Sequence, residues 1–406
     1  MKRREFLSTL TVAALGATAP GAFAQEAATS GKRLVVIFLR GGVDGLSAVV
    51  PSDDPWYFRA RPTISLPPPG QEGGTLPLVQ GFGLHPALEP LLEPWRAGTL
   101  ALIPACGLPT PIRTHPEAQR AMESGDPTEQ HPHDGWLGRL MPLLGRDAKA
   151  VTLSSVPPLI GQGRPGADNV RPSGYPPSQW LLERPAVFKF FDEVYHNNDP
   201  MSKAYQQAQI VLRNKLTELD REITVSAGGA PSVHALPTMA GQIASYLEKN
   251  PAVRLFYVDL GGFDAHFEQG TGKGRLAEVF YSLGKGVAEL VKVFGPGLED
   301  TMVLFMSEFG RSLRENEFAG TDNGHGTLFM VLGGGVAGGG LHGPWPGLAP
   351  EKLSDGLDLA AAVDFREVIS QIVLSYFGLS LESLAQVFPG YALSGTLKGL
   401  FNTLTP

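Results

Sequence analysis

The chain has 406 residues, is 43% hydrophobic and 18% charged, and carries a formal net charge of −7 at pH 7. It is long enough for two or three domains or one large α/β domain, and hydrophobic enough for a large core. No basic block follows the first few residues, so the composition excludes a role in binding the phosphate backbone of nucleic acids.

The first 24 residues predict an export signal. A basic start is followed by a short apolar stretch and a small-residue ending at 22–24, the pattern of a cleaved secretory signal and not of a membrane span. The run Arg-Arg-Glu-Phe-Leu that begins at Arg3 resembles the twin-arginine signal. No later apolar run approaches the roughly 20 residues of a membrane helix. We therefore expect a periplasmic protein without a membrane span.

Alternating apolar patterns predict an α/β fold. Continuous apolar runs, typical of strands buried on both faces, lie at 33–39, 99–105, 253–260, 301–307 and 328–334. Helical patterns lie at 86–98, 116–125, 135–145 and 274–294. This alternation favours a mainly parallel central sheet with helices on both faces. Cys106, the only cysteine, ends the second run, and we expect it to be a small buried hydrophobe.

Residues 155–235 are predicted to be an insertion within a single domain that spans 33–406. Residues 155–183 are rich in Pro and Gly and cannot form long regular elements. The pattern at 202–223 predicts a long helix. We expect a loop and helices that lean over one edge of the sheet.

Acidic and imidazole side chains follow the predicted strands. Ligands of open α/β sheets bind beyond the carboxyl ends of the strands, so these residues are candidates for a site. Singly, each has a structural alternative, such as a turn residue or a surface charge. Their shared location favours a metal site, because carboxylates and imidazoles are the usual ligands of divalent ions where thiolates are absent. The acids and histidines are Asp44, Asp264, His266, Glu308, Asp322 and His325, and Arg311 lies at the same strand end as Glu308.

Thr114 and His115 begin a predicted helix. Thr114 is a good N-cap and Pro116 suits the first turn. The free N–H groups of a helix start attract an anion. Thr114 could therefore be a nucleophile or only a cap, and His115 a donor to a neighbouring group.

Several motifs resemble, in order and spacing, the family called domain of unknown function 1501, a group of exported proteins in the alkaline phosphatase-like superfamily. The resemblance covers nearly all of the chain after the signal and implies an alkaline phosphatase-like fold. The family has no assigned reaction. The motifs lie at 40–51, 113–125, 135–139, 261–266, 307–312, 320–326, 332–343 and 364–368.

The superfamily resemblance implies a metal-dependent hydrolase of phosphate or sulfate esters, acting on a small anionic ester. Zinc is favoured over calcium, magnesium or manganese. One ion would be held by Asp264, His266 and His325, and a second by Asp44 and Glu308. Catalysis would use Thr114 as nucleophile, His115 as proton donor to the leaving group, and Arg311 or Arg113 as a clamp on the anionic group.

The chain departs from the superfamily pattern or from that of the closer family in three ways, one of which is the short spacing between Asp264 and His266. Glu308-Phe309 stands where an Asp-His pair is usual, and Asn323 stands where many family members have His. The alternative function is therefore a non-catalytic periplasmic binding or scaffold protein with a degenerate metal site. A serine hydrolase using Ser47 is disfavoured, because no Gly-x-Ser-x-Gly motif surrounds it.

Overall fold

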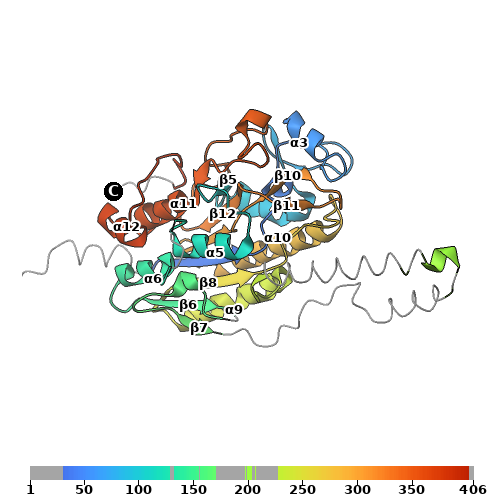
Figure 1. The fold of residues 1–406 in the computed structure, drawn as a ribbon. Helices are drawn as coiled ribbons and strands as arrows, with labels where there is room; N and C mark the ends of the chain where they lie inside the picture. The colour runs from blue at the N-terminus through green and yellow to red at the C-terminus, as the bar shows by residue number, and fades with distance from the viewer. Residues whose placement is uncertain are drawn as a thin grey trace, which may run out of the picture.

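The computed structural model describes residues 31–128, 132–154, 156–170 and 227–401, with a few positions between 197 and 206. An eight-stranded sheet lies at its centre, with the strand order β13-β5-β12-β9-β1-β8-β6-β7 (Figure 1). Its strands are β1 (Arg33–Leu39), β5 (Leu100–Gly107), β6 (Lys149–Leu153), β7 (Asp168–Val170), β8 (Val253–Leu260), β9 (Thr301–Met306), β12 (Thr327–Gly333) and β13 (Val363–Asp364).

Most neighbouring strands of this sheet run parallel. β1 pairs in parallel with β8 and β9, whereas β12 runs antiparallel to β5 and β9. The strands predicted at 33–39 and 253–260 have those bounds in the structure, and the other three apolar runs also form strands. The predicted α/β fold with a mainly parallel sheet is confirmed. The apolar runs are continuous because both faces of the sheet are covered.

Helices form a layer on each face of the sheet. Alternate side chains of β1, from Leu34 to Phe38, join one core with α5 (His115–Ser124), α6 (Trp136–Leu140), α11 (Phe365–Gln371) and α12 (Leu381–Val387). The intervening side chains, from Val35 to Leu39, join a second core with α9 (Leu236–Lys249) and α10 (Arg275–Phe294). Successive residues of a strand point to opposite faces, so one strand serves both cores. In Figure 1, α5 lies near the middle of the molecule and α12 near its left edge.

Smaller elements complete the fold. A hairpin pairs β10 (Arg311–Glu315) with β11 (Thr321–Asn323), and a second small sheet contains β2 (Val49–Val50), β4 (Phe82–Leu84) and β3 (Leu76–Val79). Two short helices, α2 (Gly45–Ala48) and α3 (Pro55–Ala60), follow β1. The helix predicted at 86–98 is a 3-10 helix at Pro86–Leu91 followed by α4 (Leu92–Arg96). Pro90 lacks the N–H that a continuous α-helix would use there.

Some predictions fall on residues outside the described part of the chain. They are the signal at 1–24 and much of the 155–235 segment, including the helix at 202–223. The described start of that segment contains β7, which pairs in parallel with β6 at the edge of the main sheet. The segment therefore begins by extending the sheet. Among the described helices, none has the length and apolar character of a membrane-spanning segment.

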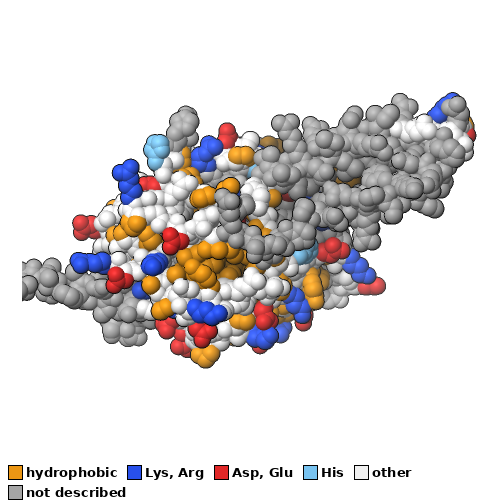
Figure 2. Space-filling model, turned by 90° about the horizontal axis from the view of Figure 1, so that it is seen from below, with side chains coloured by type: hydrophobic (Ala, Val, Ile, Leu, Met, Phe, Trp, Pro, Cys, Tyr) orange, Lys and Arg blue, Asp and Glu red, His pale blue; other side chains and the backbone are white. Residues whose placement is uncertain are grey.

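The surface carries both signs of charge. On the face shown in Figure 2, hydrophobic side chains gather near the middle, and Lys, Arg, Asp and Glu are interspersed around them. The described part of this face therefore offers no continuous basic surface.

Candidate metal centre

Three of the predicted site residues meet beyond the strand ends. His115 is the first residue of α5, and Asp264 and His266 lie in the loop after β8. One ligand atom from each lies within 4.8 Å of the others. Nε2 of His266 lies 3.3 Å from Oδ1 of Asp264, and Nε2 of His115 lies 3.8 Å from Oδ2. His115, predicted as a proton donor, thus joins the predicted ligand pair.

Two of the three side chains, His115 and Asp264, have buried ligand atoms without hydrogen bonds. Asp264 is 2% exposed, and neither of its carboxylate oxygens has a hydrogen-bond partner. Arg311 lies 3.1 Å from Oδ1 as an ion pair that lacks hydrogen-bond alignment. Nε2 of His115 is likewise buried without a hydrogen bond. Leaving such a group unsatisfied costs about 1–3 kcal/mol. Two imidazoles and one carboxylate fit a divalent ion, because catalytic zinc sites use this ligand set and keep a further position open.

Glu308 fixes the orientation of the His115 ring. Its Oε1 lies 2.8 Å from Nδ1 of His115 and also accepts hydrogen bonds from the Gly41 N–H and the Gln119 amide. Burial alone would raise the pKa of Glu308, but these hydrogen bonds lower it overall. An ionised Glu308 requires a proton on Nδ1. The lone pair of Nε2 therefore faces Asp264.

His266 has a similar support on its other nitrogen. Its Nδ1 lies 3.2 Å from Oδ1 of Asp322, while its Nε2 faces Asp264. A carboxylate on the nitrogen remote from the ion is the usual arrangement for metal-binding histidines, since it fixes the tautomer and the ring direction. Both histidines of the group have this arrangement.

Asp44 lies in a buried ion pair and not in this group. Its two oxygens accept hydrogen bonds from Arg61 at 2.7 and 3.0 Å, and both side chains are fully buried. It also accepts hydrogen bonds from the Ser47 N–H, the Ser47 hydroxyl and the Gln269 amide. Burial alone would raise the pKa of Asp44, but Arg61 and the other donors lower it overall. Protein donors thus occupy the roughly four acceptor sites of this carboxylate.

His325 also lies outside the group. Its Nε2 is 2.8 Å from the Leu108 carbonyl oxygen, and its Nδ1 is 2.9 Å from the Ser354 hydroxyl. A carbonyl only accepts, so Nε2 carries the proton and Nδ1 accepts from Ser354. Burial lowers the pKa of His325, which favours this neutral ring. Neither nitrogen has a free lone pair, and the ring connects the loop after β5 to residue 354.

Thr114 is the N-cap residue of α5, as predicted, and it is exposed. Its side chain makes no capping hydrogen bond with the helix backbone. Instead, the hydroxyl donates to Oε2 of Glu117 at 2.5 Å. The nucleophile candidate is therefore paired with a carboxylate that can accept its proton.

Arg311 is buried and held by several acceptors. Its guanidinium donates to the Gly41 carbonyl, to Thr321 and to the amide oxygen of Asn323. Burial lowers the pKa of Arg311, although the nearby Asp264 acts in the opposite direction. Because these acceptors already use its donors, Arg311 suits the role of a fixed positive charge better than that of a bidentate clamp on an anionic group.

Two of the departures, Phe309 from the superfamily pattern and Asn323 from the closer family, have structural roles. The Phe309 ring packs against the His115 ring, with centroids 4.7 Å apart. Asn323 accepts from Arg311 and donates to the backbone oxygen of Arg113. The Arg113 guanidinium pairs with Asp355 and Asp358, so its charge is balanced within the protein.

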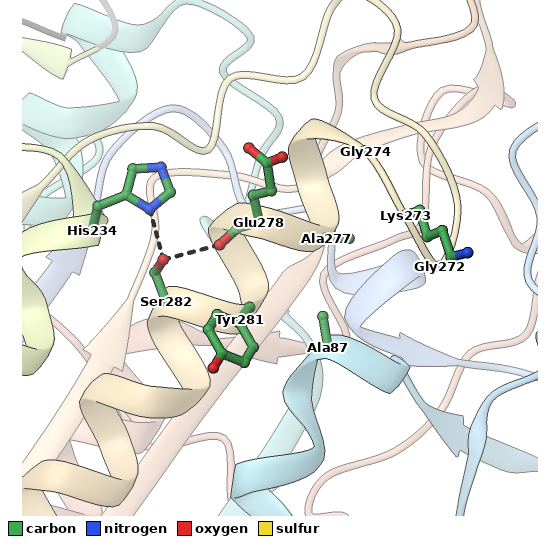
Figure 3. Close-up of a pocket in the computed structure, with 9 residues that line it drawn as sticks. All are labelled: Ala87, His234, Gly272, Lys273, Gly274, Ala277, Glu278, Tyr281 and Ser282. Carbon is green, nitrogen blue, oxygen red and sulfur yellow. Dashed lines mark hydrogen bonds between the residues drawn. The ribbon is translucent and has the colours of Figure 1, made fainter.

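A pocket of about 560 Å³ lies elsewhere and shares no residue with the group of His115, Asp264 and His266. Figure 3 shows His234 pointing toward Ser282, whose hydroxyl donates to the Glu278 carbonyl. Its other lining residues are Ala87, Gly272, Lys273, Gly274, Ala277 and Tyr281.

Sequence reasoning missed Arg61, Gln119 and Gln269. Arg61 directly follows α3, in a segment with no readable motif. Gln119 and Gln269 are uncharged and were not considered beside the acids and histidines. Nothing in a single sequence indicates which carboxylates they reach.

One family model matches the chain. The family is described as a protein of unknown function (DUF1501), and the match covers residues 193–372. The resemblance found in the motifs is therefore confirmed for this part of the chain. No curated protein sequence matches.

Solved structures of several enzymes are similar at low scores. The PsFucS1 sulfatase from Pseudoalteromonas sp. is 12% identical with a TM-score of 0.41, over 89% of this chain and 72% of that one. The lipoteichoic acid synthase LtaP from Listeria monocytogenes is 12% identical with a TM-score of 0.34, over 75% and 66%. The C-terminal periplasmic domain of EcEptC from Escherichia coli, in complex with Zn, is 12% identical with a TM-score of 0.33, over 74% and 73%. Similarities at this level do not assign an activity to this chain.

Proposed function

We propose that this chain is an exported, metal-dependent hydrolase of phosphate or sulfate esters. The observation that supports the proposal is the group of His115, Asp264 and His266, in which Nε2 of His115 and both Asp264 oxygens are buried without hydrogen bonds and both histidines are supported by carboxylates. Zinc suits the two imidazoles better than calcium or magnesium, which prefer oxygen ligands. The signal at 1–24 would direct the protein to the periplasm, and residues 155–235 would govern specificity.

The surroundings of the group favour an anionic substrate. Thr114 directly precedes His115 at the start of α5, where backbone N–H groups are free and the helix dipole is positive. Arg311 adds a buried positive charge beside Asp264. A divalent ion, when bound, would polarise a non-bridging oxygen of the ester and stabilise the developing charge.

In the proposed reaction, Oγ1 of Thr114 attacks the phosphorus or sulfur atom and gives its proton to Glu117, which already accepts that hydrogen bond. A bond forms between Oγ1 and this atom. The bond to the ester oxygen breaks with its electron pair, and the leaving alcohol takes a proton from solvent. Water then cleaves the ester on Thr114, releases phosphate or sulfate, and restores the hydroxyl.

The alternative is a non-catalytic binding or scaffold protein with a degenerate metal site. Its specific support is Phe309, an apolar ring where the superfamily pattern has an imidazole. It differs from the proposed function in a measurable way, since it would bind an ion and hydrolyse nothing.

Substitutions at Thr114 test the enzyme directly. With zinc supplied, wild type and Thr114→Ser should hydrolyse an activated aryl phosphate or sulfate. Thr114→Ala should lose the activity, because no hydroxyl remains to form the covalent intermediate. Glu117→Gln should lower kcat by about 10²–10⁴-fold if Glu117 accepts the proton. Circular dichroism confirms that each variant is folded. If zinc-loaded wild type hydrolyses none of a panel of phosphate monoesters, diesters and sulfate esters, the scaffold alternative is correct. If Thr114→Ala is as active as an active wild type, Thr114 is not the nucleophile.

A further inference from the structure

The acidic residues implied for a second metal ion are already occupied by protein groups. Asp44 receives five hydrogen bonds, from two nitrogens of Arg61, two groups of Ser47 and the amide of Gln269. The guanidinium carries a permanent positive charge at the carboxylate where a cation was expected. We infer that this protein binds a single metal ion and that Arg61 takes the place of a second cation at Asp44. The inference rests on the proposed ligands His115, Asp264 and His266.

Protein groups also occupy the Glu308 carboxylate. Its Oε1 accepts from Gly41, Gln119 and His115, and its Oε2 lies 3.1 Å from the Ser307 hydroxyl, which also lies 2.7 Å from the Leu39 carbonyl oxygen. The side chain is fully buried. Glu308 is therefore a positioning residue, which holds His115 with Nε2 toward Asp264, and not a ligand of a second ion.

Phe309 stands where an imidazole could supply a nitrogen ligand to a second metal ion. Its ring is 1% exposed and packs against the His115 ring at an interplanar angle of 45°. An imidazole there could donate a lone pair to an ion, whereas a phenyl ring cannot. The carboxylate at Asp44, the carboxylate at Glu308 and the neighbouring aromatic position are thus all unavailable to a second ion.

A hydrogen-bonded connection joins Asp44 to the metal-binding group. The Gln269 amide donates to Asp44 and accepts from Thr321, and Arg311 donates to Thr321 while it pairs with Asp264. Asp44 therefore pairs with the guanidinium of Arg61, and Asp264 with that of Arg311. Because Arg61 balances Asp44 permanently, little negative charge remains there to attract a free cation.

Counting the bound ions tests this inference. The full chain is stripped with EDTA, reloaded with excess zinc and desalted, and its zinc is measured by mass spectrometry and by calorimetric titration. We expect one equivalent. Two equivalents would overturn the single-ion inference and leave the proposed hydrolase intact. No bound zinc would overturn both, because the ligand group would then be structural.

Matched variants locate the ion. Asp264→Asn should abolish zinc binding in the titration, whereas Asp44→Asn should still bind one equivalent. Glu308→Gln should also bind one equivalent but about 10–100-fold more weakly, the usual cost of losing a carboxylate that orients a metal-binding histidine. If Asp44→Asn folds by circular dichroism and loses zinc, Arg61 is not a substitute cation. If it fails to fold, the wild-type count still decides between one ion and two.

Discussion

The substitution Asp44→Asn tests whether Asp44 is a member of a buried ion pair or a ligand of a metal ion. It keeps the size of the side chain and removes the charge that balances Arg61. Both partners are fully buried, so the variant would leave an uncompensated guanidinium in the core. Breaking a buried pair from one side costs about 3–5 kcal/mol, which is a large share of the roughly 5–15 kcal/mol that stabilise a typical protein.

The assay is urea unfolding followed by circular dichroism, with and without EDTA. The loss of stability should be the same in both conditions, because the pair needs no ion. The double variant Asp44→Asn/Arg61→Met should recover most of the loss, since neither charge then remains buried alone.

The pH dependence has a defined sign. The folded pKa of Asp44 lies below its ordinary value of 3.8. Its contribution to stability is therefore fully present above that value and is lost as the pH falls through the folded pKa. The difference between wild type and Asp44→Asn should stay constant from neutral pH down to about pH 4–5 and shrink in stronger acid. The cost expected for breaking the buried pair is about 3–5 kcal/mol. If Asp44→Asn loses less than about 1 kcal/mol of stability in EDTA but much more in zinc, Asp44 is a metal ligand and our reasoning fails.

Three further predictions follow from single positions. Gly41→Ala should weaken zinc binding, because Gly41 has a φ of +112° and a Cβ there would lie 2.6 Å from the backbone nitrogen of Asp264. The control is Gly98→Ala, where φ is +72° and a Cβ would have no neighbour within 4 Å. Calorimetric titration should show unchanged zinc affinity in this control. Cys106 should resist iodoacetamide in the folded protein and react in urea, as mass spectrometry would show, because burial raises the pKa of its thiol and blocks access. Replacement of Arg3 and Arg4 together by Lys should block export in a fractionation experiment, and full export of the double variant would remove the twin-arginine assignment.

The sheet could be predicted from the sequence because its signal is local. A strand covered on both faces must be apolar at nearly every position, and runs such as 253–260 have few other interpretations. The rule that ligands gather beyond strand ends then selected Asp264 and His266. The bounds of the helices were less accurate where proline interrupts them, as at Pro90.

The roles of the acids and histidines could not be predicted, because they depend on partners far away in the chain. Asp44 and Asp264 both follow strands and are both buried, yet only Asp44 meets Arg61. His115 and Glu308 are 193 positions apart. His325 stands in a loop that suggests a ligand, but Leu108 and Ser354 use its two nitrogens. A residue type indicates what a side chain can bind, and only the fold decides what reaches it.

A single ion changes what must activate the nucleophile. With two ions, one can lower the pKa of the attacking hydroxyl while the other polarises the substrate. Here the acids expected at the second position are held by Arg61 and His115, so in the proposed reaction a protein group would have to accept the proton of Thr114. Glu117 lies one helical turn further along α5 and already accepts the hydrogen bond from that hydroxyl. The absence of a capping bond at Thr114 fits this assignment, because the hydroxyl is directed to the carboxylate and not to the helix backbone. The occupied acids at the second position and the Thr114–Glu117 pair therefore favour the proposed arrangement, in which one ion would bind the substrate and the start of α5 would supply both nucleophile and base.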